Sequence, residues 1–195
     1  MPQQRQSKAA RYGRAELLVA IILILAVISI MGPVLRRTYQ TSLILRCRHQ
    51  LVQIFDAVRN YAQSSGGHPP CQDVPLGEGS IGTWREQVDL LLRADDNPRG
   101  EGKNRLWDCP AGGGYVGNVH VFGPPHAPMD SFKLRLEIGV IADGAQESDD
   151  AGLGGFGDIE WRHRGGANVI FLDGRVQWIH EDKAWAVRRY WDRPQ

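Results

Sequence analysis

The strongest pattern along the chain is an uninterrupted apolar run close to its start. No residue from Leu17 to Leu35 carries a charge. A helix over this run is about 28 Å long, which matches the hydrocarbon thickness of a bilayer. A removable signal peptide usually has a shorter apolar core followed by a small-x-small cleavage site, and no such site follows this run. The run therefore predicts a retained transmembrane helix over residues 16–35.

Helical periodicity continues beyond this run. Apolar residues recur at spacings of three and four, which is typical of one stripe on an amphipathic helix. The stripe consists of Ile44, Cys47, Leu51, Ile54, Val58 and Tyr61. Glycines and prolines then end the helix at Gly66, Gly67, Pro69 and Pro70. The pattern predicts a basic leader (1–15), the transmembrane part of a long helix (16–35), its soluble part (36–65) and an α+β domain (66–195). Pro33 is expected to kink the helix.

The C-terminal third of the chain shows the alternation of β-strands. Asp173-Gly174 predicts a two-residue type I′ hairpin turn, in which Phe171 pairs with Val176 and Val169 pairs with Trp178. A second turn near residues 164–166 would complete a three-stranded meander from Asp158 to Ile179. Its apolar face would contain Ile159, Trp161, Val169, Phe171, Val176 and Trp178. We expect this face to pack on the soluble part of the long helix.

Two short helices are expected beside the sheet. Thr83 and Glu86 have the spacing of a capping box, which predicts a helix beginning near Trp84. A terminal helix is predicted from Ala184, Val187 and Trp191. Among the six tryptophans, those next to basic residues are the ones expected to form subunit contacts. They are Trp185 and Trp191, beside Arg188 and Arg189.

Composition and charge exclude several classes of protein. Lys and Arg number 23 against 22 Asp and Glu, so the net charge of +1 gives no reason to expect a nucleic-acid partner. The chain has three cysteines and no Cys-x-x-Cys pair, which makes a structural zinc site an unfavoured interpretation. Cys71 and Cys109 lie in loop-like sequence and could form a disulfide outside the cytoplasm, with two unpaired thiols as the alternative. Cys47 is interpreted as a helix-packing residue.

Candidate chemistry is sparse. His163 and Asp173 could be an acid–base pair, but Asp173 is already explained by the turn that it forms. Neither a Gly-x-Ser-x-Gly nor a His-Glu-x-x-His motif accompanies them. The sequence therefore favours a protein that is not an enzyme and has no catalytic residues.

One acidic segment is a candidate ion site. Closely spaced carboxylates with glycines can bind calcium, although the spacing here differs from that of an EF-hand. The candidate ligands are Asp143, Glu147, Asp149, Asp150 and Asp158. A solvated acidic loop without a metal is the favoured interpretation. No other cofactor is expected.

Two distant motifs together resemble a known family. The stretch Glu16-Leu-Leu-Val-Ala-Ile21, continued by apolar residues to Pro33, resembles the N-terminus of type IV pilins and of type II secretion pseudopilins. Near the C-terminus, His163 followed after nine residues by Asp173-Gly174 matches the His-x9-Asp-Gly motif of one large pseudopilin-like subfamily. The resemblance implies a pilin-like α+β fold, in which a long N-terminal helix, half of it transmembrane, packs on a C-terminal antiparallel sheet.

The resemblance also implies how the N-terminus is processed and used. A prepilin peptidase would cut between Arg11 and Tyr12, and the new N-terminus would be methylated. This chain departs from the family pattern, because Arg11 stands where the family has glycine and the nearest glycine is Gly13. Glu16 would then bind the free amine of a neighbouring subunit during assembly. The alternative is that Glu16 is a helix N-terminal acid favoured by the helix dipole.

As a pseudopilin, the protein would be a structural subunit for protein transport in a type II secretion or type IV pilus-like assembly. Its partners would be other pilin-like subunits, an inner-membrane assembly platform and the prepilin peptidase. It would cross the inner membrane once, with its C-terminal domain in the periplasm. The alternatives are a signal-anchored extracytoplasmic binding protein that does not polymerise and a membrane-tethered hydrolase.

Overall fold

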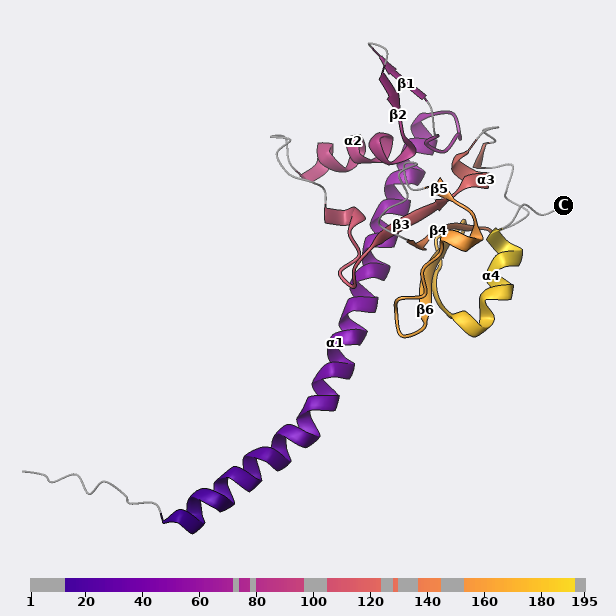
Figure 1. The fold of residues 1–195 in the computed structure, drawn as a ribbon. Helices are drawn as coiled ribbons and strands as arrows, with labels where there is room; N and C mark the ends of the chain where they lie inside the picture. The colour runs from indigo at the N-terminus through magenta and orange to yellow at the C-terminus, as the bar shows by residue number, and fades with distance from the viewer. Residues whose placement is uncertain are drawn as a thin grey trace, which may run out of the picture. The chain divides into compact units, whose positions relative to one another are not determined.

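The computed structural model describes residues 13–71, 74–77, 80–96, 105–123, 128–129, 137–144 and 153–191 of the chain (Figure 1). The chain divides into two compact units, Met1–Thr41 and Ser42–Gln195. The first helix, α1 (Arg14–Ser64), contributes residues to both units. Each unit is therefore described by itself.

In the first unit, the described residues form the front part of α1. The helix continues through Pro33, although proline has no amide hydrogen to donate to the carbonyl four residues earlier. Each large apolar side chain from Leu17 to Leu35 is exposed, from 44% at Ile21 to 70% at Ile30. This part of α1 is long and apolar enough to cross a membrane, and none of its apolar window is buried within the protein.

The second unit combines the back part of α1 with two sheets and several short helices. After α1 follow β1 (Val74–Gly77), β2 (Ser80–Gly82), α2 (Trp84–Asp96), η1 (Arg105–Trp107), β3 (Gly114–Asn118), α3 (Val119–Phe122), β4 (Gly139–Gly144), β5 (Leu153–Gly154), η3 (Phe156–Asp158), β6 (Gly166–Phe171), β7 (Val176–His180), η4 (Glu181–Lys183) and α4 (Ala184–Trp191). Strands β1 and β2 pair with each other. The main sheet has the strand order β5-β3-β4-β6-β7. Its pairs are antiparallel except for β3 with β5, so the fold is α+β with a mixed sheet and not the purely antiparallel one expected.

The back part of α1 packs on one face of the main sheet, as the helical stripe predicts. Cys47, Leu51, Ile54 and Val58 are completely buried, and residues of β3, β4 and β6 complete this cluster. Trp84 and Val88 of α2 close it at one side. At about 1.5–3 kcal/mol for each large apolar side chain, this contact is the main source of stability in the unit.

The opposite face of the sheet is covered as well, which sequence patterning did not predict. Alternate residues of the strands, among them Val116 and Val169, form a second cluster with Val187 and Trp191 of α4. Figure 1 shows α1 and α4 on opposite sides of β4 and β6. Trp191 is 1% exposed and therefore belongs to the core, not to a subunit interface as expected, whereas Trp185 is 73% exposed.

The hairpin between β6 and β7 differs by one residue from the predicted register. Ile170 pairs with Val176 and Asn168 with Trp178. In the connection, the Phe171 amide donates to the Arg175 carbonyl at 3.0 Å, and the Gly174 amide donates to the Phe171 carbonyl at 2.8 Å.

This connection is a three-residue loop with a single left-handed position. Gly174 has a φ of +84°, whereas Asp173 is not among the described residues with positive φ. A type I′ turn needs positive φ at both central positions, so the prediction of that turn at Asp173-Gly174 is wrong. A shift of one residue moves side chains to the other face of a strand, which is why Trp178 does not lie with Val169.

The predicted first strand of the meander is also wrong. Residues 156–158 form the short helix η3, and Ile159 makes an isolated bridge to Gly144. The partner of β6 is β4, which comes more than twenty residues earlier in the chain. A turn with two positive φ angles does exist nearby, at Arg164 (59°) and Gly165 (74°), and it directly precedes β6.

The capping box of α2 is confirmed. The Glu86 amide donates to Thr83 Oγ1 at 3.2 Å, and the Thr83 amide donates to Glu86 Oε2 at 2.8 Å. These reciprocal bonds satisfy two amides that the helix itself leaves unpaired. They fix the start of α2, and with it the position of Trp84 in the core.

Replacing Gly174 by alanine should destabilise the protein by about 1–2 kcal/mol, because an L side chain pays that cost in the left-handed region. An added Cβ would also lie 3.4 Å from Phe55 Cε1. The matched control is Gly157→Ala, where a Cβ meets no described atom within 4 Å. Thermal unfolding of the full chain in detergent measures both variants, and equal melting temperatures would contradict the assignment of the loop.

Candidate functional site

The first candidate site is the start of α1. Glu16 lies in the first helical turn, and its Oε2 accepts a hydrogen bond from the Gly13 amide at 3.0 Å. The carboxylate thus caps its own helix and stands at the end that the helix dipole makes positive. Arg11 and Tyr12, where processing is expected, lie outside the described residues. Gly13 directly precedes α1 and contacts Glu16 through this hydrogen bond, whereas Pro33 lies further along the same helix.

The hydroxyl groups of Ser29, within the exposed apolar segment, and of Thr38, just after it, donate to the helix backbone. Ser29 donates to the carbonyl of Leu25 at 2.8 Å, and Thr38 donates to that of Val34 at 3.0 Å. Such bonds to the preceding turn let a polar side chain enter lipid without an unpaired donor. The surface that this segment presents is therefore apolar in chemistry as well as in composition.

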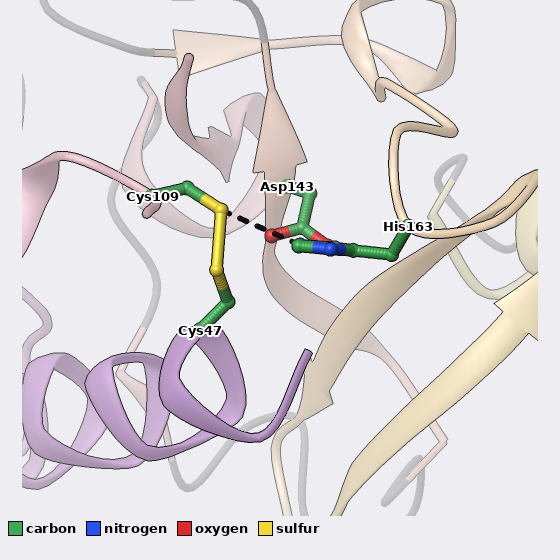
Figure 2. A group of neighbouring side chains, drawn as sticks. All are labelled: Cys47, Cys109, Asp143 and His163. Atoms are coloured by element: carbon green, nitrogen blue, oxygen red, sulfur yellow. Dashed lines mark hydrogen bonds and ion pairs between the residues drawn. A yellow bond between two sulfur atoms is a disulfide. The ribbon is translucent and has the colours of Figure 1, made fainter. Parts of the chain in front are cut away.

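The second candidate site is a buried cluster around His163 (Figure 2). His163 is 1% exposed, and its Nε2 lies 3.3 Å from Asp143 Oδ2 and 3.4 Å from Cys109 Sγ. Cys109 forms a disulfide with Cys47 of α1, with a Cα–Cα distance of 5.6 Å. One potential ligand atom from each of these four residues lies within 4.8 Å of all the others. Four distant parts of the chain therefore meet at one point.

Asp143 is completely buried, like Cys47, and is held by the neighbouring strand. Its Oδ2 accepts hydrogen bonds from the Asn168 amide at 2.6 Å and from Asn168 Nδ2 at 3.1 Å. Its Oδ1 has no hydrogen-bond partner among the described residues. A buried carboxylate oxygen without a hydrogen-bond partner costs free energy. Oδ1 therefore marks a place where the described contacts leave an acceptor unpaired.

The disulfide corrects the expected pairing of Cys71 with Cys109. Cys47 faces the sheet from the buried stripe of α1, whereas Cys71 lies beside Gln87 of α2, whose Nε2 donates to the Cys71 carbonyl. Cys71 is a free buried cysteine, and burial raises the pKa of its thiol. Helical periodicity correctly predicted that Cys47 is buried, but it gave no information about which cysteine would be its disulfide partner.

His163 and Asp173 do not form an acid–base pair. Asp173 is exposed, and its Oδ1 accepts a hydrogen bond from the Arg175 amide at 2.9 Å. The two residues stand at opposite ends of β6, so the nine-residue spacing corresponds to one strand and its connections. His163 contacts the cluster that contains Cys47, and Gly174 approaches Phe55, two turns further along α1. The motif thus positions β6 against the helix at both ends of the strand.

The calcium candidates are not brought together. Asp143 faces His163, whereas Asp158 accepts a hydrogen bond from the Gly155 amide at 2.8 Å. Glu147, Asp149 and Asp150 lie outside the described residues. The group of possible metal ligands found among the described residues contains Asp143 but not Asp158. Asp143 therefore belongs to a different site from the one expected.

Charged and phenolic groups surround the cluster. The Arg162 guanidinium donates to the carbonyls of Gly112 and Gly144 and forms an ion pair with Glu160 at 2.6 Å. Tyr115 donates to Gln50 Oε1 at 2.8 Å. Burial and the nearby Asp143 carboxylate raise the pKa of the Tyr115 phenol. All four cluster residues are buried, each at most 4% exposed.

Alkylation followed by mass spectrometry tests the cysteine pairing. The folded, unreduced chain should react slowly with iodoacetamide, because the Cys71 thiol is buried and its raised pKa disfavours the reactive thiolate. Denaturation without reduction should expose one reactive residue, Cys71. Labelling of Cys47 under those conditions would show that a different pair forms.

Loss of the disulfide should also weaken the fold. Cys47→Ser is expected to lower the free energy of unfolding by about 4 kcal/mol, from the chain entropy of a crosslink with a sequence separation of 62. Cys71→Ser is the matched control and should change it by less than about 1 kcal/mol, because serine can keep the bond to the Pro69 carbonyl.

The described residues therefore offer two sites of different kinds, an exposed apolar helix with Glu16 at its start and a buried cluster that joins helix to sheet. No protein-family model matches the chain, and neither a curated protein nor a solved structure matches it.

Proposed function

We propose that this protein is a membrane-anchored, pilin-like structural subunit, a pseudopilin, of a type II secretion or type IV pilus-like assembly. The observation that carries the proposal is the exposed apolar surface of α1. Its large side chains from Leu17 to Leu35 are 44–70% exposed among the described residues of their unit, whereas the continuation of the same helix lies in the core of the second unit. A surface of this size must be covered by lipid or by other apolar helices.

One helix surface can serve both purposes in turn. In the membrane, acyl chains cover the apolar side chains, and the internally bonded hydroxyls of Ser29 and Thr38 leave no unpaired donor. In a filament, the same surface would pack on the equivalent helices of neighbouring subunits. Such contacts are heterologous and do not close, so one pair of surfaces repeats along the assembly.

The motif at the start of the helix supports assembly over simple anchoring. Glu16 is a carboxylate at the edge of an apolar segment, where an unpaired charge is costly. The amine created by cleavage before Tyr12 of a neighbouring subunit would provide its partner. The hydrogen bond from the Gly13 amide leaves the carboxylate exposed and able to accept another donor.

The second unit supports a structural role on the outer side of the membrane. A disulfide is stable in an oxidising compartment such as the periplasm. His163 is 1% exposed and contacts Asp143 and the Cys109 sulfur, which supports a structural role for this histidine over one in a membrane-tethered hydrolase. With the leader in the cytoplasm, the sheet would lie in the periplasm.

Substitution of Glu16 separates the two roles of this carboxylate. Glu16→Ala removes both the cap and the charge, whereas Glu16→Gln keeps an acceptor for the Gly13 amide and removes only the charge. If Glu16 binds the amine of a neighbour, both variants should lower assembly roughly tenfold or more, which corresponds to about 1.4 kcal/mol.

Assembly can be measured in the native membrane by disulfide crosslinking through Leu25→Cys, which lies on the exposed part of α1. Resistance to carbonate extraction serves as the control for membrane insertion and should not change. Normal crosslinking of the Gln variant with loss in the Ala variant would assign Glu16 to helix capping. Normal crosslinking in both would exclude it from assembly.

Intact mass and N-terminal sequencing of the protein from its native membrane test the processing step. We expect a chain that begins at Tyr12 and carries one added methyl group. A chain that retains its first eleven residues would show that Arg11 blocks the peptidase. That result would favour a signal-anchored binding protein that does not polymerise.

A further inference from the structure

We propose that Cys47, Cys109, Asp143 and His163 form a tetrahedral zinc site when the two cysteines are reduced, and that formation of the disulfide releases the ion. The inference concerns the interior of the second unit. It is independent of whether the protein assembles through α1.

The donor set is one that zinc prefers. Structural zinc sites combine four ligands from cysteine, histidine and carboxylate, in tetrahedral geometry. The four residues provide two sulfurs, one imidazole nitrogen and one carboxylate oxygen, and all four are at most 4% exposed. Burial excludes competing water ligands, which favours a closed site over a catalytic one with an open position.

The distances fit a zinc ion as well. With zinc bonds of about 2.3 Å to sulfur and about 2.0–2.2 Å to nitrogen and oxygen, tetrahedral ligands lie about 3.3–3.8 Å from one another. His163 Nε2 lies 3.4 Å from Cys109 Sγ and 3.3 Å from Asp143 Oδ2. Figure 2 shows the imidazole, the carboxylate and the sulfurs converging on one point. Opening the disulfide would let Cys47 Sγ occupy the remaining position.

A second, independent observation comes from the surroundings of Asp143. Its Oδ1 is buried without a hydrogen-bond partner among the described residues, although the residue is fully buried. The two bonds from Asn168 hold Oδ2 in place, as outer residues orient a metal-binding carboxylate. Rotation of the carboxylate, or binding through both oxygens, would give Oδ1 the positive partner that it lacks.

The net charge around the ion would be small. Two thiolates and one carboxylate around Zn²⁺, with neutral His163, leave one net negative charge in the cluster. The Arg162 guanidinium donates to the carbonyl of Gly144, the residue after Asp143, and to that of Gly112, which follows Cys109 in the same turn. Arg162 also forms an ion pair with Glu160, so this pair adds no further net charge beside the cluster.

The redox step is a two-electron reduction. A phosphine or dithiol reductant supplies two electrons, the sulfur–sulfur bond breaks and each sulfur takes up one proton. Zinc binding then releases both protons, because the thiolate is the ligand. In reverse, a small disulfide accepts two electrons from the two thiolates and, with two protons, becomes two thiols; the new Cys47–Cys109 disulfide removes two of the four ligands, so the ion leaves. The same two cysteines therefore connect α1 to the sheet in either state.

Cobalt titration of the full chain in detergent tests the site. The chain is reduced with a phosphine under anaerobic conditions and titrated with Co²⁺, with excess Zn²⁺ added at the end. We expect one equivalent to give a thiolate-to-cobalt charge-transfer band and the intense visible bands of tetrahedral cobalt, both of which zinc should abolish. The oxidised chain should give neither band. Absence of these bands in the reduced chain would overturn the proposal.

Variants locate the ligands. Asp143→Asn keeps the shape of the side chain and should weaken metal binding roughly 100-fold, since it replaces an anionic ligand by a neutral one. Cys71→Ser should bind normally, because Cys71 lies outside the cluster. Equal affinity of the Asp143→Asn variant, or loss of binding in Cys71→Ser, would contradict the assignment.

Alkylation gives a readout that does not depend on spectra. In the reduced chain, saturating zinc should slow the reaction of Cys47 and Cys109 with iodoacetamide at least tenfold, which peptide mass mapping can measure. If reduction unfolds the second unit, zinc should restore its circular dichroism. Failure of zinc to protect the thiols or to restore the fold would overturn the proposal.

Discussion

The second unit depends on the contact between the back part of α1 and the main sheet. The fully buried side chains of Leu51, Ile54 and Val58 meet β3, β4 and β6 there, and the disulfide from Cys47 joins the two layers covalently. Hydrophobic packing provides most of the energy, because it buries several large side chains at once. The position of β6 against the helix follows from contacts at both ends of that strand, at His163 and at Gly174.

Much of the α-helical structure could be predicted from local patterns, because its determinants are local. The stripe through Leu51 and Ile54, and the capping box at Thr83 and Glu86, depend on spacings within a few turns and agree with the structure. The strand pairing could not be predicted in the same way. The partner of β6 is the distant β4, and a single left-handed residue, Gly174, decides the register of β7. Because α4 covers the second face of the sheet, both faces of β6 are buried. The strand therefore lacks the alternation of apolar and polar residues that would have shown which side chains face α1.

The buried cluster shows the same limit. Sequence reasoning singled out His163, Asp143 and Cys109, but it assigned them to a turn motif, a calcium loop and a different disulfide. They meet because β4, the turn before β6 and the loop after η1 all end beside Cys47 of α1. Side chains brought together from four separate segments leave no common spacing in the sequence. Asp143 directly follows three consecutive apolar residues of β4, a strand in which every residue is buried, so no alternation showed which way its carboxylate faces.

The place of Cys47 along α1 has a mechanical consequence. A pull applied at the N-terminal end of the helix reaches Cys47 before it reaches Leu51, Ile54 or Phe55. The disulfide then transmits the force directly to Cys109, so the chain between the two cysteines does not carry it. Packing and strand hydrogen bonds yield under small forces, but this route contains no non-covalent step between helix and loop. A domain joined to its helix in this way stays attached under tension as long as the disulfide is intact, whereas reduction without a bound metal would leave the joint to packing alone.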